Sequence, residues 1–97
     1  MAKYISLLNW TDQGIRNAKD SINRANAARK AFQSAGGKIT DIYWTIGSYD
    51  VVVVFEAPDS DTAYRMMLAT GMQGNVRTVT MPAMDEQTMA KVLQGLP

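Results

Sequence analysis

Alternation of apolar and polar positions along this chain predicts four short strands. In residues 39–46, Ile42 and Trp44 fall on one face of an extended backbone, and Asp41 and Tyr43 fall on the other. The run Val-Val-Val-Val-Phe that follows is apolar on both faces, which is typical of a central strand that is covered on both sides. The predicted strands are residues 3–9, 39–46, 51–55 and 75–81.

The connection between the two middle strands is short and contains glycine, which predicts an antiparallel hairpin. Its residues are Gly47, Ser48, Tyr49 and Asp50. In the structural interpretation, Gly47 supplies a positive φ and the Asp50 side chain bonds back to the turn backbone. In the functional interpretation, the Tyr49 hydroxyl and the Asp50 carboxylate stand at a pocket mouth. Acid/base work near pH 7 would require large shifts of both pKa values.

Apolar positions that recur every three or four residues predict an amphipathic helix over residues 15–35, which Asp20 and Ser21 can interrupt because both favour caps. Gly36 and Gly37 end it. The other face of this helix is basic, and we interpret it as solvated rather than as an anion site. Its charged residues are Arg16, Lys19, Arg24, Arg29 and Lys30.

Two further helices are predicted. The first starts at Asp59 or Ser60 and runs to about Thr70, and the second is capped by Asp85 and runs through Leu93. Between them, Pro82 is expected to stop the last strand. The order of elements is therefore β-α-β-β-α-β with a terminal helix. It predicts an α+β, ferredoxin-like plait: a four-stranded antiparallel sheet with the first and third strands central and both main helices on one face.

Two helices leave the second face of such a sheet uncovered. We expect that face to hold half of residues 51–55 together with Tyr4, Leu8 and Tyr43. An exposed apolar sheet marks an interaction surface. The simplest partner is a second copy, so the sequence predicts a homodimer, or a higher homo-oligomer, built through the sheet face.

Composition narrows the classes of partner. The 97 residues are expected to form one domain with a formal net charge of +1, which gives no electrostatic reason to expect nucleic acid or an anionic membrane. No apolar run reaches the roughly 18 residues of a membrane span, and no export signal is visible. We therefore expect a cytoplasmic protein.

The chain contains neither Cys nor His. Disulfides, thiolate metal sites, Cys nucleophiles and every Ser-His-Asp arrangement are therefore excluded. This makes an enzyme the less favoured expectation, and we expect no metal and no cofactor. Most of the methionines lie between Met66 and Met89, and thioether clusters can bind copper(I). Soft core packing is the favoured interpretation.

We interpret most of the large aromatic side chains as filling the core or an interface. If a cavity exists on the sheet face or between helices and sheet, they are the candidate walls of a ligand pocket. Arg77 could hold a carboxylate or phosphate, or form an ion pair with Asp50, Asp41 or Glu56, and we favour the ion pair. Trp44 is a further candidate wall. The candidate ligand-binding residues are Trp10, Tyr43, Tyr49, Asp50 and Arg77.

Four separated motifs resemble the GYD-domain family of small bacterial proteins, which is named for a Gly-x-Tyr-Asp turn. The motifs are residues 9–14 (NWTDQG), 43–45 (YWT), 47–50 (GSYD) and 74–78 (GNVRT). The resemblance runs over nearly the whole chain. It implies a ferredoxin-like fold of the dimeric α/β-barrel type, and it implies no particular chemistry.

Three functions remain open, in this order. The first is a small-molecule binding module with a mostly apolar pocket. The second is a cofactor-free enzyme of isomerase or monooxygenase type, which rests on fold analogy alone. The third is an interaction or scaffold protein whose sheet serves assembly. RNA binding is excluded because residues 51–55 offer valines where an RNA-binding sheet needs basic and aromatic residues.

Overall fold

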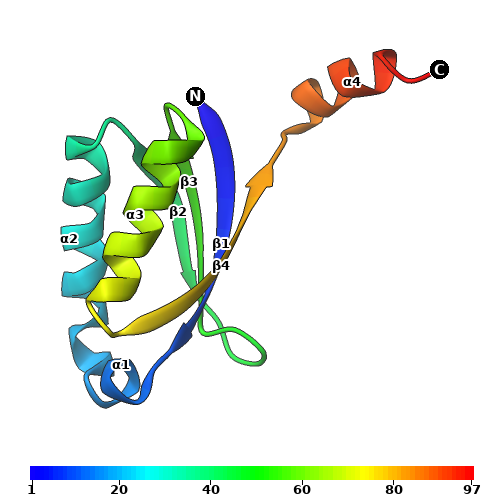
Figure 1. Ribbon diagram of the computed structural model, residues 1–97. Coiled ribbons are helices and arrows are strands. Elements are labelled where there is room, and N and C mark those ends of the chain that lie inside the picture. The colour runs from blue at the N-terminus through cyan, green and yellow to red at the C-terminus, as the bar shows by residue number, and fades with distance from the viewer.

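The computed structural model describes residues 1–97 and shows one antiparallel sheet with helices on one side (Figure 1). A single 3-10 turn, η1, precedes the first long helix. The elements follow the chain as β1 (Ala2–Trp10), α1 (Asp12–Arg16), η1 (Ala18–Asp20), α2 (Ser21–Ser34), β2 (Lys38–Trp44), β3 (Val51–Ala57), α3 (Ser60–Met72), β4 (Val76–Ala83) and α4 (Glu86–Gln94). This confirms the ferredoxin-like fold with a terminal helix.

The strand order is β2-β3-β1-β4, so β1 and β3 are central as predicted. Alternate side chains of both strands point toward the helices and form the core. Phe55 at its centre is fully buried, stacks on Tyr4 with ring centroids 5.2 Å apart, and meets Phe32 of α2 edge-on at 5.3 Å. Aromatic pairs in these geometries add to the apolar burial that holds the two layers together.

The structure corrects the prediction of which β1 side chains lie on the uncovered face of the sheet. Tyr4 and Leu8 were expected on the uncovered face, but both are buried beneath the helices, opposite Phe55 and Val51 in the register. The uncovered face instead receives Ile5 and Leu7. Because β1 is apolar on both faces, period-two alternation could not tell which face points inward.

A bulge in β2 explains how Ile39 and Ile42, three residues apart, both contact the core. Ile39 lies opposite Phe55, Asp41 opposite Val54, and Thr40 is the unpaired extra residue between them. The Thr40 hydroxyl donates to the Val54 carbonyl, 3.1 Å away, where the ladder is interrupted. An extra residue shifts the alternation by one position, so that Ile39 and Ile42 share a face.

One predicted boundary was wrong, and one predicted helix is interrupted where the sequence allowed a break. β4 does not stop at Pro82 but continues to Ala83, with Pro82 opposite Tyr4. Proline is tolerated there because β4 is an edge strand. The predicted helix 15–35 is divided into α1, η1 and α2, and the break falls before Ser21, where the sequence allowed one.

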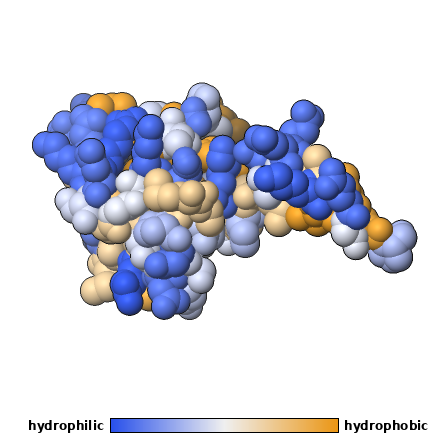
Figure 2. Space-filling model, turned by 90° about the horizontal axis from the view of Figure 1, so that it is seen from above, coloured by the Kyte–Doolittle hydropathy of each residue, from blue (hydrophilic) through white to orange (hydrophobic).

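One face of the sheet is uncovered, and α4 projects away from the body (Figure 1). On that open face, Tyr43, Val79 and Met81 are exposed, and four central residues are half-buried. Hydrophobic side chains also follow one side of α4 (Figure 2). We call two sets of residues the open face (Ile5, Leu7, Tyr43, Val52, Val54, Val79 and Met81) and the α4 stripe (Met89, Val92, Leu93 and Leu96).

Candidate functional site: a hollow between two helices and the sheet

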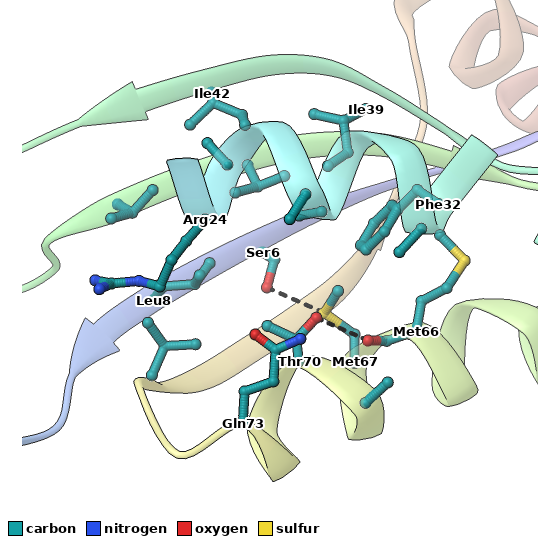
Figure 3. A pocket seen from close by; sticks show the side chains of 18 of the residues that line it. Ser6, Leu8, Arg24, Phe32, Ile39, Ile42, Met66, Met67, Thr70 and Gln73 are labelled. Atoms are coloured by element: carbon teal, nitrogen blue, oxygen red, sulfur yellow. Dashed lines mark hydrogen bonds between the residues drawn. The ribbon is translucent and has the colours of Figure 1, made fainter. Parts of the chain in front are cut away.

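A cavity of about 480 Å³ lies between α2, α3 and the helix-facing side of the sheet (Figure 3). The two helices are held by the sheet rather than by each other, since α2 packs on β2 and α3 packs on β3 and β4. The gap between them exposes the central strands. The floor of the cavity is formed by Ser6, Leu8, Trp10, Ile39, Ile42, Trp44, Val51, Val53 and Val76.

Small side chains leave this space empty. Most of the α2 residues that face the cavity are alanine, and Ala69 and Thr70 lie across from them on α3. A methyl group cannot reach across a gap between two helices that a Leu or Phe would fill. The alanines that line the cavity on this side are Ala25, Ala27, Ala28 and Ala31 of α2 and Ala35, the residue that follows its last turn.

The floor carries one polar side chain, Ser6, which has no exposed surface. Its hydroxyl shares a hydrogen bond of 2.8 Å with the Thr80 hydroxyl and donates a weaker one to the Met67 sulfur, 3.5 Å away. A buried hydroxyl is costly unless it is paired, and these contacts satisfy it. Ser6 therefore marks the middle of an otherwise apolar floor.

The two ends of the cavity differ in character. Figure 3 places Arg24 near one end and Phe32 with Met66 at the other. At the Arg24 end, the Trp44 indole N–H donates to the Ser21 hydroxyl at 2.8 Å and ties β2 to the first turn of α2. Four polar side chains of the lining lie at this end, where α2 begins and α3 ends, and they are Ser21, Arg24, Gln73 and Asn75. Thr62 and Arg65 lie at the other end, in the first turns of α3.

Arg24 is fixed by backbone rather than by carboxylates. Its guanidinium donates to the carbonyls of Asn17, at 2.8 Å, and Gly14, at 3.4 Å. Asp20, one turn earlier, accepts from Asn23 instead. The sequence placed Arg24 on a solvated face, but the structure shows it half-buried in the cavity lining, unlike Arg16 and the other exposed basic residues of the segment.

Of the residues predicted from the sequence as a ligand site, Trp10 lines this cavity and the others lie elsewhere. Trp44, considered as a further wall, also lines it. Tyr43 and Arg77 lie on the uncovered side of the sheet, opposite Val52 and Asn9 respectively.

Tyr49 and Asp50 belong to the loop between β2 and β3, where Gly47 has the expected positive φ of 128°. The Asp50 side chain does not bond back to the turn. Its carboxylate accepts from the Trp10 N–H at 2.9 Å, and the Asp50 N–H donates to the Leu8 carbonyl at 2.8 Å. These bonds fasten the loop to the end of β1, so Asp50 holds Trp10 in place.

Two of the other sequence motifs also meet next to Trp10. The Thr11 N–H donates to the Asn75 carbonyl at 3.0 Å, and the Gln13 side chain donates to the Gln73 carbonyl and to the Asn75 side chain. Gly14 is packed so closely against Asn75 that a side chain there would overlap the Asn75 carbonyl. The motifs at residues 9–14, 47–50 and 74–78 therefore build one joint at the Trp10 end of the cavity.

Two carboxyl groups have lowered pKa values, and both are helix caps. For Asp59, hydrogen bonds from the Thr62 hydroxyl and N–H lower the pKa, desolvation opposes them, and the charge of Arg65 adds a smaller lowering. For Asp85, the Thr88 N–H and hydroxyl have the same effect, with smaller contributions from two lysines. These shifts belong to the starts of α3 and α4.

The cavity lining contains two arginines, Arg24 and Arg65, and no Asp, Glu, Lys or Tyr. It can hold an apolar molecule and donate hydrogen bonds, but it offers no side chain that could accept a proton near neutral pH. Nowhere do three or more carboxylate side chains gather as a metal site would require. No helix is both long enough and apolar enough to cross a bilayer.

Sequence reasoning missed Ser6, Arg24 and Gln73 as lining residues. One signal was available for the hollow itself: helix 21–34 carries alanine at most positions of its inner face, where a core helix usually carries larger residues. Nothing in the sequence showed that Arg24 would bend over the end of that face, because its position depends on carbonyls of the preceding loop.

Comparisons with known proteins agree with this architecture. In Thermus thermophilus, a protein named glutamine synthetase and cystathionine beta-lyase binding protein is 31% identical over 84 residues, which cover 86% of this chain and 88% of that protein. The crystal structure of MtbAldR is similar in fold, with a TM-score of 0.70 at 13% identity. It matches 88% of this chain, which spans about half (54%) of that longer one.

The family model of the GYD domain matches residues 4–93. The match includes all four motifs that carried the resemblance, and three of them build the joint around Trp10. The chain belongs to the GYD-domain family.

Proposed function

We propose that this protein is a binding module that holds a small, mostly apolar molecule in the hollow between α2 and α3. The observation that carries the proposal is the cavity of about 480 Å³ whose α2 wall is mostly alanine. Its volume is in the usual range of ligand sites, about 300–1,000 Å³, and its lining is mostly apolar with a few polar groups, as in such sites. The absence of a proton acceptor favours binding over acid/base catalysis.

A neutral apolar fluorophore, N-phenyl-1-naphthylamine, tests this proposal. We expect it to bind with one site per chain, and we expect Ala28→Leu, which fills the hollow, to weaken binding at least about tenfold while the melting temperature is unchanged or higher. Ala90→Leu on α4 is the matched control and should bind like the unaltered protein. Failure to bind, or equal binding by both variants, would overturn the proposal.

The open face supports assembly with a second copy. Its centre is apolar, and its border carries Lys3, Asn9, Asp41, Glu56 and Arg77. An apolar centre with a polar rim is the usual anatomy of a protein interface. In the proposed homodimer the two sheets pack face to face, and Tyr43 and Arg77 lie at the interface. The helices, and the hollow between them, remain on the outer side of each sheet.

A role in binding other proteins is the second candidate. It is supported by the name of the Thermus relative, which describes binding to two enzymes, and by the α4 stripe, which packs on no other element. In this proposal the α4 stripe docks on a partner enzyme, as amphipathic helices do in apolar grooves.

The partners to test are purified glutamine synthetase and cystathionine β-lyase from the same organism as this chain. Their binding to the immobilised protein is measured by biolayer interferometry. We expect binding to at least one enzyme, reduced at least about tenfold by Leu93→Glu in the α4 stripe. Gln94→Glu is the control, since it adds the same charge beside the stripe. Binding to neither enzyme, or equal binding by both variants, would remove this candidate.

A further inference from the structure

The ionisable side chains that line the hollow are all positively charged. Among all its lining residues the only ionisable side chains are Arg24 and Arg65, so the lining carries two positive charges and no negative one. The whole chain, by contrast, is nearly neutral, with ten basic and nine acidic residues. A cavity that contains only cations raises the local concentration of anions.

The two arginines are not equivalent. Arg65 is exposed on the rim, at the start of α3, where its charge acts on the Asp59 carboxylate after the larger effect of Thr62. Arg24 is half-buried, and both of its protein partners are neutral carbonyls. These carbonyls orient the guanidinium without cancelling its charge. Arg24 is therefore the stronger site for an anionic group, because charge-assisted hydrogen bonds are strong where solvent is partly excluded.

Arg24 and the apolar pair Phe32 and Met66 lie at opposite ends of the hollow. Gln73, at the end of α3, shares the Arg24 end with Ser21, and its side chain lies in the cavity in Figure 3. At the other end, Phe32, Met66 and Ile39 form an apolar wall, and Thr62 and the exposed Arg65 lie beside it in the first turns of α3. A ligand that satisfies both ends has a charged head and an apolar body.

We propose that the hollow selects an amphipathic organic anion. Its carboxylate head binds Arg24 with help from Gln73, and its hydrocarbon body lies along the alanine face of α2 toward Phe32 and Met66. This inference rests on the proposed binding function and adds the chemical class of the ligand. The predicted specificity is one of charge: a neutral or cationic head on the same chain loses the contact with Arg24.

Displacement of N-phenyl-1-naphthylamine by three ligands with a ten-carbon chain tests the charge preference at pH 7. We expect decanoate to displace the probe at a concentration about tenfold lower than decan-1-ol, and decyltrimethylammonium to be weakest, because a hydrogen bond to a charged group contributes enough for roughly that factor. Equal displacement by decanoate and decan-1-ol would overturn the charge preference and leave the binding function standing. A probe that does not bind would overturn the function itself.

Two variants test where the carboxylate head of the ligand binds. Arg24→Gln should weaken decanoate about tenfold and leave decan-1-ol unchanged, while Arg16→Gln, on an exposed position of α1, should change neither. Arg24→Gln also removes the bonds from Arg24 to two backbone carbonyls. Gln73→Glu leaves those bonds intact and adds a negative charge at the same end of the hollow, so it should also weaken decanoate binding. If both variants bind decanoate like the unaltered protein, the assignment of the head group to this end is wrong.

Discussion

Gly14 occupies a point where two backbones touch, and no side chain fits there. We expect Gly14→Ala to lower the free energy of unfolding by about 2–3 kcal/mol, because its methyl group would overlap the Asn75 carbonyl and force the joint at Trp10 apart. Gly71→Ala is the matched control: nothing lies within 4 Å of the added methyl, so it should be neutral or stabilising by up to about 1 kcal/mol. Urea unfolding of both variants measures the difference.

Asp50 fastens the β2–β3 loop to β1. Asp50→Ala removes the acceptor of the Trp10 N–H, and we expect a loss of about 2 kcal/mol of unfolding free energy. Asp50→Asn keeps an oxygen that can accept the same bond and should lose less. If thermal and urea denaturation show both variants to be as stable as the unaltered protein, the Asp50–Trp10 bond contributes nothing to the fold.

At this scale the sequence predicted the importance of residues 47–50 but not their contacts. The positive φ of Gly47 follows from residue type. The bond from Asp50 to a residue 40 positions earlier does not, because it depends on where β1 ends in the sheet. The same holds for Arg24, whose place in the cavity is set by carbonyls of another loop.

Among the elements, α3 and α4 begin with aspartate caps whose pKa values are lowered in the folded state. A lowered pKa means that the charged form stabilises the fold, so this stabilisation is complete above the ordinary pKa of 3.8 and is lost as pH falls below it. We expect helical circular dichroism to decrease in that window. The double variant Asp59→Asn with Asp85→Asn keeps side-chain caps that do not titrate, and it should lose less helix. An unchanged acid profile would contradict this role of the caps.

Element types were predicted well and element ends less well. The recurrence of apolar positions identified the long helices, and alternation or a continuous apolar run identified the strands. The end of β4 was wrong because the tolerance of Pro82 depends on β4 being an edge strand, which is a property of the sheet. The bulge at Thr40 was missed because it shows only in the pairing of β2 with β3.

For the whole molecule, the proposed face-to-face dimer makes a direct prediction. Val79→Glu places a charge on the open face, on the edge strand β4, and we expect it to convert a dimer into a monomer in sedimentation velocity because burying an unpaired charge is costly. Leu68→Glu, an equally exposed leucine on α3, should leave the dimer intact. A monomeric unaltered protein, or a dimer that tolerates Val79→Glu, would contradict assembly through this face.

The pocket as a whole could be predicted only in part. The sequence indicated large aromatic walls, and Trp10 and Trp44 do line the hollow. The hollow itself results from what is missing between two helices, and the distance between helices is fixed by the sheet on which both pack. A pattern of small residues indicates room for close packing as readily as room for a ligand.

The most direct test of ligand binding in the hollow is a two-dimensional ¹H–¹⁵N NMR titration of the protein with N-phenyl-1-naphthylamine. If the hollow is the binding site, amide shifts will concentrate at residues that surround it on the facing helices, such as Ala28, Phe32, Met66 and Thr70. Amides of Val79 and Met81 on the open face, and those of α4, will stay in place. Shifts confined to the open face or α4, with α2 and α3 unchanged, would show that the hollow is not a binding site.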